Sequence, residues 1–189
     1  MERNSLFIAK PIRGSCNSGI QIVERPDQIA ELTNSNDYMG QRIVLGNEYT
    51  INLCVSQDGN CICSIPHERI SLQNGEPDQA TTAKITEILD LYHSVVSTLQ
   101  GTRGPINIRG FYKRAAGKPE VVEINPRLGG GFPLADKAGG SFIESLALEY
   151  LDGQELTPFS QWTGGLRMMR YRDAFFDFPV SEADSCLQA

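Results

Sequence analysis

The sequence lacks a long apolar run. No stretch of its 189 residues approaches the roughly 20 apolar residues of a membrane-spanning helix. The N-terminal segment MERNSLFIAKP has no signal-peptide hydrophobic region. We therefore predict no membrane partner and expect a cytoplasmic protein. A chain of this length suits one domain, of one or two lobes, with a real hydrophobic core.

Positive charge is also scarce. Lys and Arg together number 17, whereas Asp and Glu number 23, which gives a formal net charge of −6. An acidic chain is a poor match for nucleic acid as its main partner, although a local basic pocket remains compatible with it. We therefore predict no nucleic-acid partner.

Cysteine pairs with metal-ligand spacing are missing. The five cysteines form no C-x-x-C pair; they are Cys16, Cys54, Cys61, Cys63 and Cys186. If Asp58-Gly59 is a two-residue hairpin turn, Cys54 lies opposite Cys63 and a disulfide is conceivable. Reduced thiols packed on a sheet are favoured for a cytosolic chain.

The apolar pattern predicts an α+β domain with a mostly antiparallel sheet and two packing helices. Strands are expected over residues 5–10, 20–24, 42–45, 49–56, 60–66, 105–113, 120–124 and 166–171, with a hairpin turn at Asp58-Gly59. Residues 33–40 are expected to be a polar linker and residues 71–78 a loop. A short helix is expected over residues 26–32.

The two packing helices are expected over residues 79–100 and 141–151. The first has an apolar stripe at helical spacing: Ile85, Ile88, Leu89, Tyr92, Val96 and Leu99. The second begins with a capping box of Ser141 and Glu144. Its predicted inner face is Phe142, Ile143, Leu146, Ala147, Tyr150 and Leu151.

The stretch VVEINPRLGGG, residues 121–131, concentrates polar groups at a strand end. Glu123 and Asn125 are two residues apart, so both side chains point to one face and offer oxygen ligands for Mg²⁺. Arg127 is suited to gripping phosphate oxygens, and the three glycines let backbone N–H groups approach an anion. The alternative is a strand end with a polar rim and a flexible turn.

A second stretch, KPIRGSCNSGI, consists of a strand ending in Lys10, a Gly/Ser loop and a second strand. Loops of this composition can fold over phosphates, with Lys10 adding charge. It is neither a P-loop nor a G-x-G-x-x-G motif. A hairpin loop with no ligand is the alternative.

Together with QRIVLGNEYTINL and GPINIRGF, and in that order along the chain, these motifs resemble the ATP-grasp superfamily. The resemblance is to its carbamoyl-phosphate-synthase-like, carboxylate–amine ligase branch, over roughly residues 6–155. It implies the C-terminal portion of such a protein. Residues 1–45 would be a remnant of the small lobe, 46–180 the larger lobe and 181–189 a tail.

The resemblance implies an ATP site. Lys10 would contact the phosphates, and Gly14 and Ser15 would belong to the loop that closes over them. The backbone around Ile43 and Val44 would bind adenine.

The resemblance also assigns acidic and cationic roles. Glu48 would bind the ribose hydroxyls, and Glu123 and Asn125 would ligate one or two magnesium ions. Arg127 would face the transferred phosphate as the catalytic residue. The implied reaction activates a carboxylate as an acyl phosphate for attack by an amine. The resemblance does not specify which carboxylate and which amine.

Several positions depart from the family pattern. Arg109 stands where Gln is a usual metal ligand, so it points elsewhere, replaces one cation, or marks a degraded site. Position 42 is Arg where Glu is usual, and Cys16 stands where the loop often has Gly.

A lone histidine, His67, beside Arg69 in PHER is expected either near substrate or on a surface loop. His93 is expected to be partly exposed.

Because the chain starts almost at Lys10, we expect a split gene product, a truncated paralogue or an excised fragment. An alternative function is a nucleotide-binding or scaffolding module without turnover, completed by an N-terminal partner chain. Open edges of the strands at 5–10 and 20–24 also predict homodimerisation.

Overall fold

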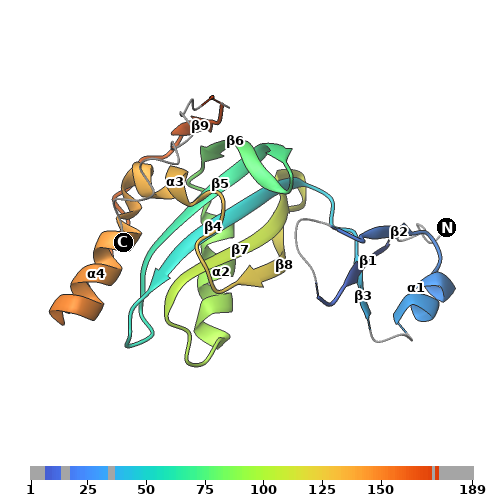
Figure 1. The fold of residues 1–189 in the computed structure, drawn as a ribbon, viewed down its shortest axis with the longest axis horizontal. Helices are drawn as coiled ribbons and strands as arrows, with labels where there is room; N and C mark the ends of the chain where they lie inside the picture. Colours follow the sequence, from blue (N-terminus) through green and yellow to red (C-terminus); the bar gives the residue numbers. More distant parts are fainter. Residues whose placement is uncertain (1–6, 14–17, 34–36, 172, 175–189) are drawn as a thin grey trace, which may run out of the picture.

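Two antiparallel sheets organise the chain (Figure 1). The computed structural model describes residues 7–13, 18–33, 37–171 and 173–174. A three-stranded sheet has the order β2-β1-β3, and a six-stranded sheet has the order β8-β7-β4-β5-β6-β9. Every recorded strand pairing is antiparallel, which confirms the predicted α+β class.

The small sheet comprises β1 (Phe7–Pro11), β2 (Gln21–Val23) and β3 (Tyr38–Arg42), and α1 (Pro26–Thr33) follows β2. The third strand was predicted wrongly, at residues 42–45 instead of 38–42. Exposed and half-buried positions make up β3, an edge strand. Its sequence YMGQR therefore carries no apolar alternation that would mark it as a strand.

The large sheet contains β4 (Asn47–Val55), β5 (Cys61–Gln73), β6 (Glu76–Thr82), β7 (Gly104–Lys113), β8 (Lys118–Asn125) and β9 (Arg167–Met169). A single 3₁₀ turn, Arg114–Ala116, joins β7 to β8.

The β4–β5 hairpin turns at Asp58-Gly59 as predicted, and Cys54 lies opposite Cys63. Both thiols are free, and burial raises the pKa of Cys63 to about 12, so it stays protonated. Cys16 and Cys186 lie outside the described residues.

The β5–β6 hairpin replaces a predicted loop and the predicted start of a helix. Strand β5 continues to Gln73, and Asn74 and Gly75 turn the chain with φ angles of 53° and 79°. Residues 79–82 then pair in β6, so the helix predicted from residue 79 begins at Thr86. Asn-Gly is a strong hairpin signal when alternating apolar residues flank it. Here the flanking residues are mostly polar, so the sequence did not indicate two strands.

Helix α2 (Thr86–Thr98) covers one face of the large sheet. Its predicted stripe is confirmed at Ile88, Tyr92 and Val96, which are buried. These side chains pack on alternate residues of β4 and β7, including Ile51, Leu53, Ile106 and Ile108.

The opposite face is covered in part by α3 (Phe132–Ala135), a π-helical turn (Asp136–Gly140) and α4 (Phe142–Asp152) (Figure 1). The capping box is wrong, because Ser141 has a left-handed φ of 42° and makes no side-chain cap hydrogen bond.

Half of the predicted inner face of α4 is also wrong. Phe142 is buried, but Ile143, Tyr150 and Leu151 are exposed, and Ser145 and Glu149 are buried instead. Glu149 accepts a hydrogen bond of 2.8 Å from the backbone N–H of Gln57, so a polar contact faces inward.

No helix among the described residues is long and apolar enough to cross a membrane.

Candidate functional site

Part of the sheet face on which α3 and α4 lie is polar instead of apolar. Residues paired across antiparallel strands share a face. Arg109 pairs with Thr50 and with Glu123, and Asn107 pairs with Asn52 and with Asn125. These side chains form a polar floor, while further along the same face Cys54, Ile65 and Phe142 form an apolar core.

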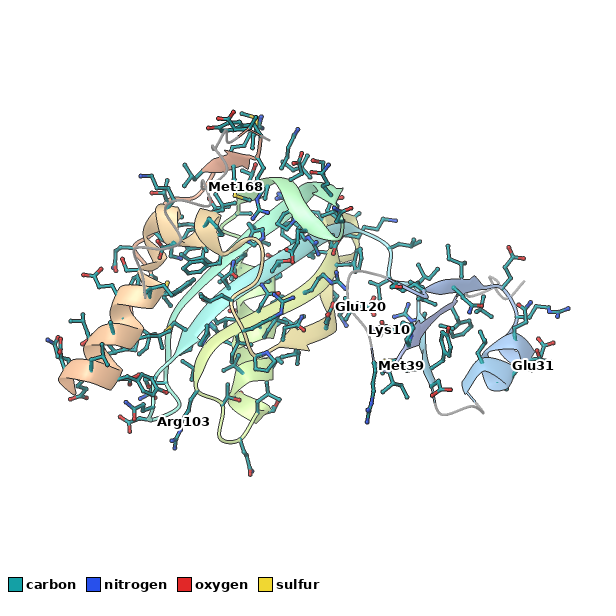
Figure 2. The ribbon with its side chains drawn as sticks, viewed as in Figure 1. Lys10, Glu31, Met39, Arg103, Glu120 and Met168 are labelled. Atoms are coloured by element: carbon teal, nitrogen blue, oxygen red, sulfur yellow. The ribbon has the colours of Figure 1, made fainter. Side chains whose placement is uncertain are left out.

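A cleft of about 410 Å³ lies between the two sheets, over this floor. The small sheet contributes Lys10 and Met39, and Figure 2 shows both on the side facing the large sheet. Arg109, Glu123, Asn125, Arg127 and Glu76 line it from the large sheet.

Strand β3 holds the two sheets together beside the cleft. Arg42 of β3 forms an ion pair with Glu120 of β8. Gln41 donates a hydrogen bond of 3.4 Å to the carbonyl of Val122.

The cleft brings together Lys10 and the side chains of the EINPR motif. Glu123, Asn125 and Arg127 line both the cleft and a smaller pocket of about 50 Å³ beneath it. The Arg127 backbone N–H donates to the Asn125 carbonyl at 2.9 Å, so the chain turns directly after β8. A cation from one sheet therefore lies across the cleft from a carboxylate, an amide and a guanidinium.

Arg109 points into this site. Its Nη2 contacts Glu123 Oε2, and its Nε lies 3.6 Å from Glu48 Oε1. Of the three expectations for Arg109, the first, that it points elsewhere, is wrong.

The residues expected to bind adenosine lie outside the lining of the cleft. Glu48 is paired with arginines, and Ile43 and Val44 are half-buried in the link between β3 and β4. None of these three lines the cleft in the described part of the chain. Gly14 and Ser15 lie outside the described residues, although Ser18, from the same loop, lines the cleft.

Arg69, the neighbour of His67 in PHER, belongs to the site. Its side chain is only 4% exposed; Nη1 donates to Glu48 Oε1 at 2.6 Å, and Nη2 donates to the Gly75 carbonyl. Burial lowers the pKa of Arg69, and the neighbouring Glu48 opposes that shift. Alternation along β5 is the signal that could have found it, because His67 and Arg69 share a face.

His67 lies in the buried polar core, so the surface-loop expectation is wrong. It is fully buried on β5, and burial, followed by the charge of Arg69, lowers its pKa to about 3. Asn107 Nδ2 donates to Asn52 Oδ1 at 3.2 Å, and Asn52 Nδ2 lies 3.4 Å from His67 Nδ1. This chain of amides holds a neutral imidazole whose Nε2 has no partner among the described atoms.

The three glycines pack against this polar floor. A Cβ at Gly129 would collide with the Asn107 amide, one at Gly130 with the Glu76 carboxylate, and one at Gly131 with the His67 imidazole. Close packing is therefore one reason for glycine at these positions. Their predicted approach to an anion stays a prediction.

Few oxygen ligands for a magnesium ion lie at the cleft. Among the described residues, no group of three His, Cys, Asp or Glu side chains is placed to hold a metal. Glu123 and Asn125 offer oxygen atoms at the cleft, and Mg²⁺ is often held by one or two protein groups plus substrate phosphates.

Comparisons with known proteins agree with the resemblance seen in the sequence. A family profile described as ATP-grasp domain matches residues 2–131. No curated protein matches the chain in a sequence search.

Several solved structures share the fold. N5-carboxyaminoimidazole synthetase from Staphylococcus aureus, complexed with ADP, aligns with a TM-score of 0.64 and 15% identity over 82% of this chain and 43% of that one. A complex of biotin carboxylase with beta-gamma-ATP from Campylobacter jejuni aligns with a TM-score of 0.64 and 15% identity over 85% of this chain and 40% of that one. The biotin carboxylase domain of the Hydrogenobacter thermophilus 2-oxoglutarate carboxylase, with MgADP and bicarbonate, gives 0.65 and 14% over 85% and 40%.

At these identities the likeness concerns the fold, and the chain spans less than half the length of each of these three proteins.

Proposed function

The chain belongs to the ATP-grasp family, and on that premise we propose that its cleft binds Mg·ATP for the activation of a carboxylate as an acyl phosphate. One observation carries the proposal: Lys10 of the small sheet and Glu123, Asn125 and Arg127 of the large sheet line one cleft. The solved relatives with ADP or ATP support a nucleotide as the ligand. Because the chain spans less than half of those proteins, the proposed activity is that of a more complete assembly.

The cations of the cleft suit a polyphosphate. Phosphoryl transfer depends on positioning and charge neutralisation more than on a protein nucleophile. Lys10 on one side and Arg127 on the other would hold the phosphate chain between the sheets. Arg127, at the turn after β8, would neutralise charge on the transferred phosphoryl group.

In the proposed reaction a substrate carboxylate oxygen attacks the γ-phosphorus, the bond to the β,γ-bridging oxygen breaks, and ADP leaves. An amine nitrogen then attacks the carbonyl carbon of the acyl phosphate, phosphate leaves, and the nitrogen loses a proton. Glu123 and Asn125 would hold Mg²⁺, which supplies charge neutralisation at the phosphates.

A second function, nucleotide binding without turnover, is favoured by one contact. Arg109 occupies Oε2 of Glu123, one of the few oxygen ligands in the cleft. In this alternative the chain is a binding module, completed by a partner chain or by self-association. Turnover by the assembled protein separates the two functions, because both require nucleotide binding.

Mg·ATP is expected to stabilise the chain against unfolding. A ligand at about 100 times its dissociation constant adds ~2.7 kcal/mol to the free energy of unfolding. Thermal unfolding monitored by circular dichroism, with Mg·ATP and with Mg²⁺ alone, measures this effect. An unchanged melting temperature at millimolar nucleotide would contradict both functions.

Lys10→Gln is expected to weaken nucleotide binding about tenfold or more, because one charge-assisted hydrogen bond to phosphate is lost. Isothermal titration with ADP measures the affinity. Lys137→Gln is the matched control, because Lys137 is exposed in the π-helical turn and does not line the cleft. Equal affinities for the two variants would remove Lys10 from the site.

A further inference from the structure

We propose that Arg109 is a resident cation of the nucleotide site, so that the nucleotide binds with one divalent ion and the guanidinium takes the place of a second. This inference rests on the proposed function and deepens it. It names a residue of this chain that would neutralise negative charge on the phosphates.

The contacts of Arg109 fix a positive charge in the floor of the cleft. Arg109 stands opposite Glu123 in the β7–β8 register, and its Nη2 contacts Glu123 Oε2. On its other side, Nε lies 3.6 Å from Glu48 Oε1. The side chain is only 24% exposed, so the surrounding strands hold it in place.

Arg109 also keeps donors that these carboxylates do not use. A guanidinium has five N–H groups in a planar fork. The Nε group is buried without a hydrogen-bond partner among the described atoms. Nε lies 3.6 Å from Glu48 Oε1, which is too far for a hydrogen bond. Arg109 lines both the cleft and the pocket beneath it, where the oxygen atoms of a phosphate would meet the terminal N–H donors that Glu123 does not use.

The same contacts leave few ligands for a second metal ion. One oxygen of Glu123 faces the guanidinium, which leaves the other oxygen and the Asn125 amide for a single ion. A carboxylate at Glu76 also lines the cleft, but its Oε2 lies against Gly130. A second dication beside Arg109 would in addition meet charge repulsion.

The test counts metal ions on the bound nucleotide. The full chain is saturated with ADP, and Mn²⁺ is titrated while electron paramagnetic resonance measures free Mn²⁺. We expect one Mn²⁺ per bound ADP in the wild type. Arg109→Gln, which removes the charge and frees Glu123, is expected to bind two, whereas Arg109→Lys retains the charge and is expected to bind one.

ADP binding without metal measures the contribution of Arg109 to nucleotide affinity. With EDTA present, Arg109→Gln is expected to bind ADP about tenfold more weakly than the wild type, because one charge-assisted hydrogen bond is lost. Arg25→Gln is the matched control: it removes an exposed guanidinium paired with Asp27 at 3.5 Å, away from the cleft.

The outcomes separate the two proposals. Two Mn²⁺ ions per ADP in the wild type would overturn the role of Arg109 and leave the nucleotide site intact. No ADP binding by the wild type, with or without Mn²⁺, would overturn the proposed function and this inference with it. The wild-type count can overturn the role of Arg109 even if a variant fails to fold.

Discussion

Replacing Arg69 with Met is expected to lower the free energy of unfolding by about 3–5 kcal/mol, because it breaks a buried ion pair from one side. The Arg69 side chain is 4% exposed and Glu48 is 17% exposed. Without Arg69, Glu48 keeps only Arg109, at 3.6 Å, as a cationic partner among the described residues, and the Gly75 carbonyl loses its side-chain donor. A half-buried carboxylate with only this weaker ion pair would then remain under the cleft, and its desolvation dominates the loss. Urea unfolding followed by circular dichroism gives the value.

The double variant Arg69→Met with Glu48→Gln removes both charges. It is expected to recover part of the lost stability, because the penalty comes from the unpaired charge and not from the absence of the pair. Arg25→Gln supplies the comparison for an exposed pair, whose loss is expected to cost about 1 kcal/mol or less. A loss below about 1 kcal/mol for Arg69→Met would show that water reaches Glu48.

Local signals in the sequence were sufficient for the central part of the fold. Asp58-Gly59 between two apolar runs determined the β4–β5 hairpin and placed Cys54 opposite Cys63. The stripe at Ile88, Tyr92 and Val96 predicted the face of α2 that the sheet buries. In both places the apolar residues whose spacing indicates the strand or helix are also the residues that pack in the core. One apolar pattern therefore predicts both the element and its buried face.

The same reasoning failed where tertiary contacts outweigh apolar periodicity. The third strand of the small sheet is a polar edge, and β6 reads as polar because much of it is half-buried or exposed. Half of the predicted inner face of α4 is wrong, and the inward-facing Glu149 instead accepts a hydrogen bond from the Gln57 backbone, a contact between residues far apart in the sequence.

The site was predictable only as far as its motif extended. Spacing on one strand placed Glu123 and Asn125 together, and the resemblance added Lys10 from the other sheet. The burial of Arg69 and His67 was not predictable, because a guanidinium and an imidazole side chain on one strand do not by themselves indicate a buried position. Their roles depend on the neighbouring strands that bring Glu48, Asn52 and Asn107 to them.

Acidification is expected to destabilise the fold through His67. Its pKa is about 3 in the folded chain, against about 6.5 for an unperturbed imidazole, so the unfolded chain takes up the proton first. The stabilising contribution is therefore complete above about pH 6.5 and is lost as the pH falls toward 3. At ~1.4 kcal/mol per pH unit, the loss between pH 7 and pH 4 is about 3 kcal/mol.

Urea unfolding of the wild type and of His67→Gln across this pH range isolates the effect, because both proteins share the carboxylates that titrate at the acidic end. The glutamine side chain of this variant does not titrate, so the variant is expected to be less stable at pH 7 and to lose stability more slowly on acidification. His93→Gln removes the only other histidine, from an exposed position on α2, and is the matched control. If the wild type and His67→Gln lost stability in parallel between pH 7 and pH 5, the imidazole would be solvated in the folded chain. The stack of Asn107, Asn52 and His67 beneath Gly131 would then be open to water and could not serve as a dry floor for the cleft.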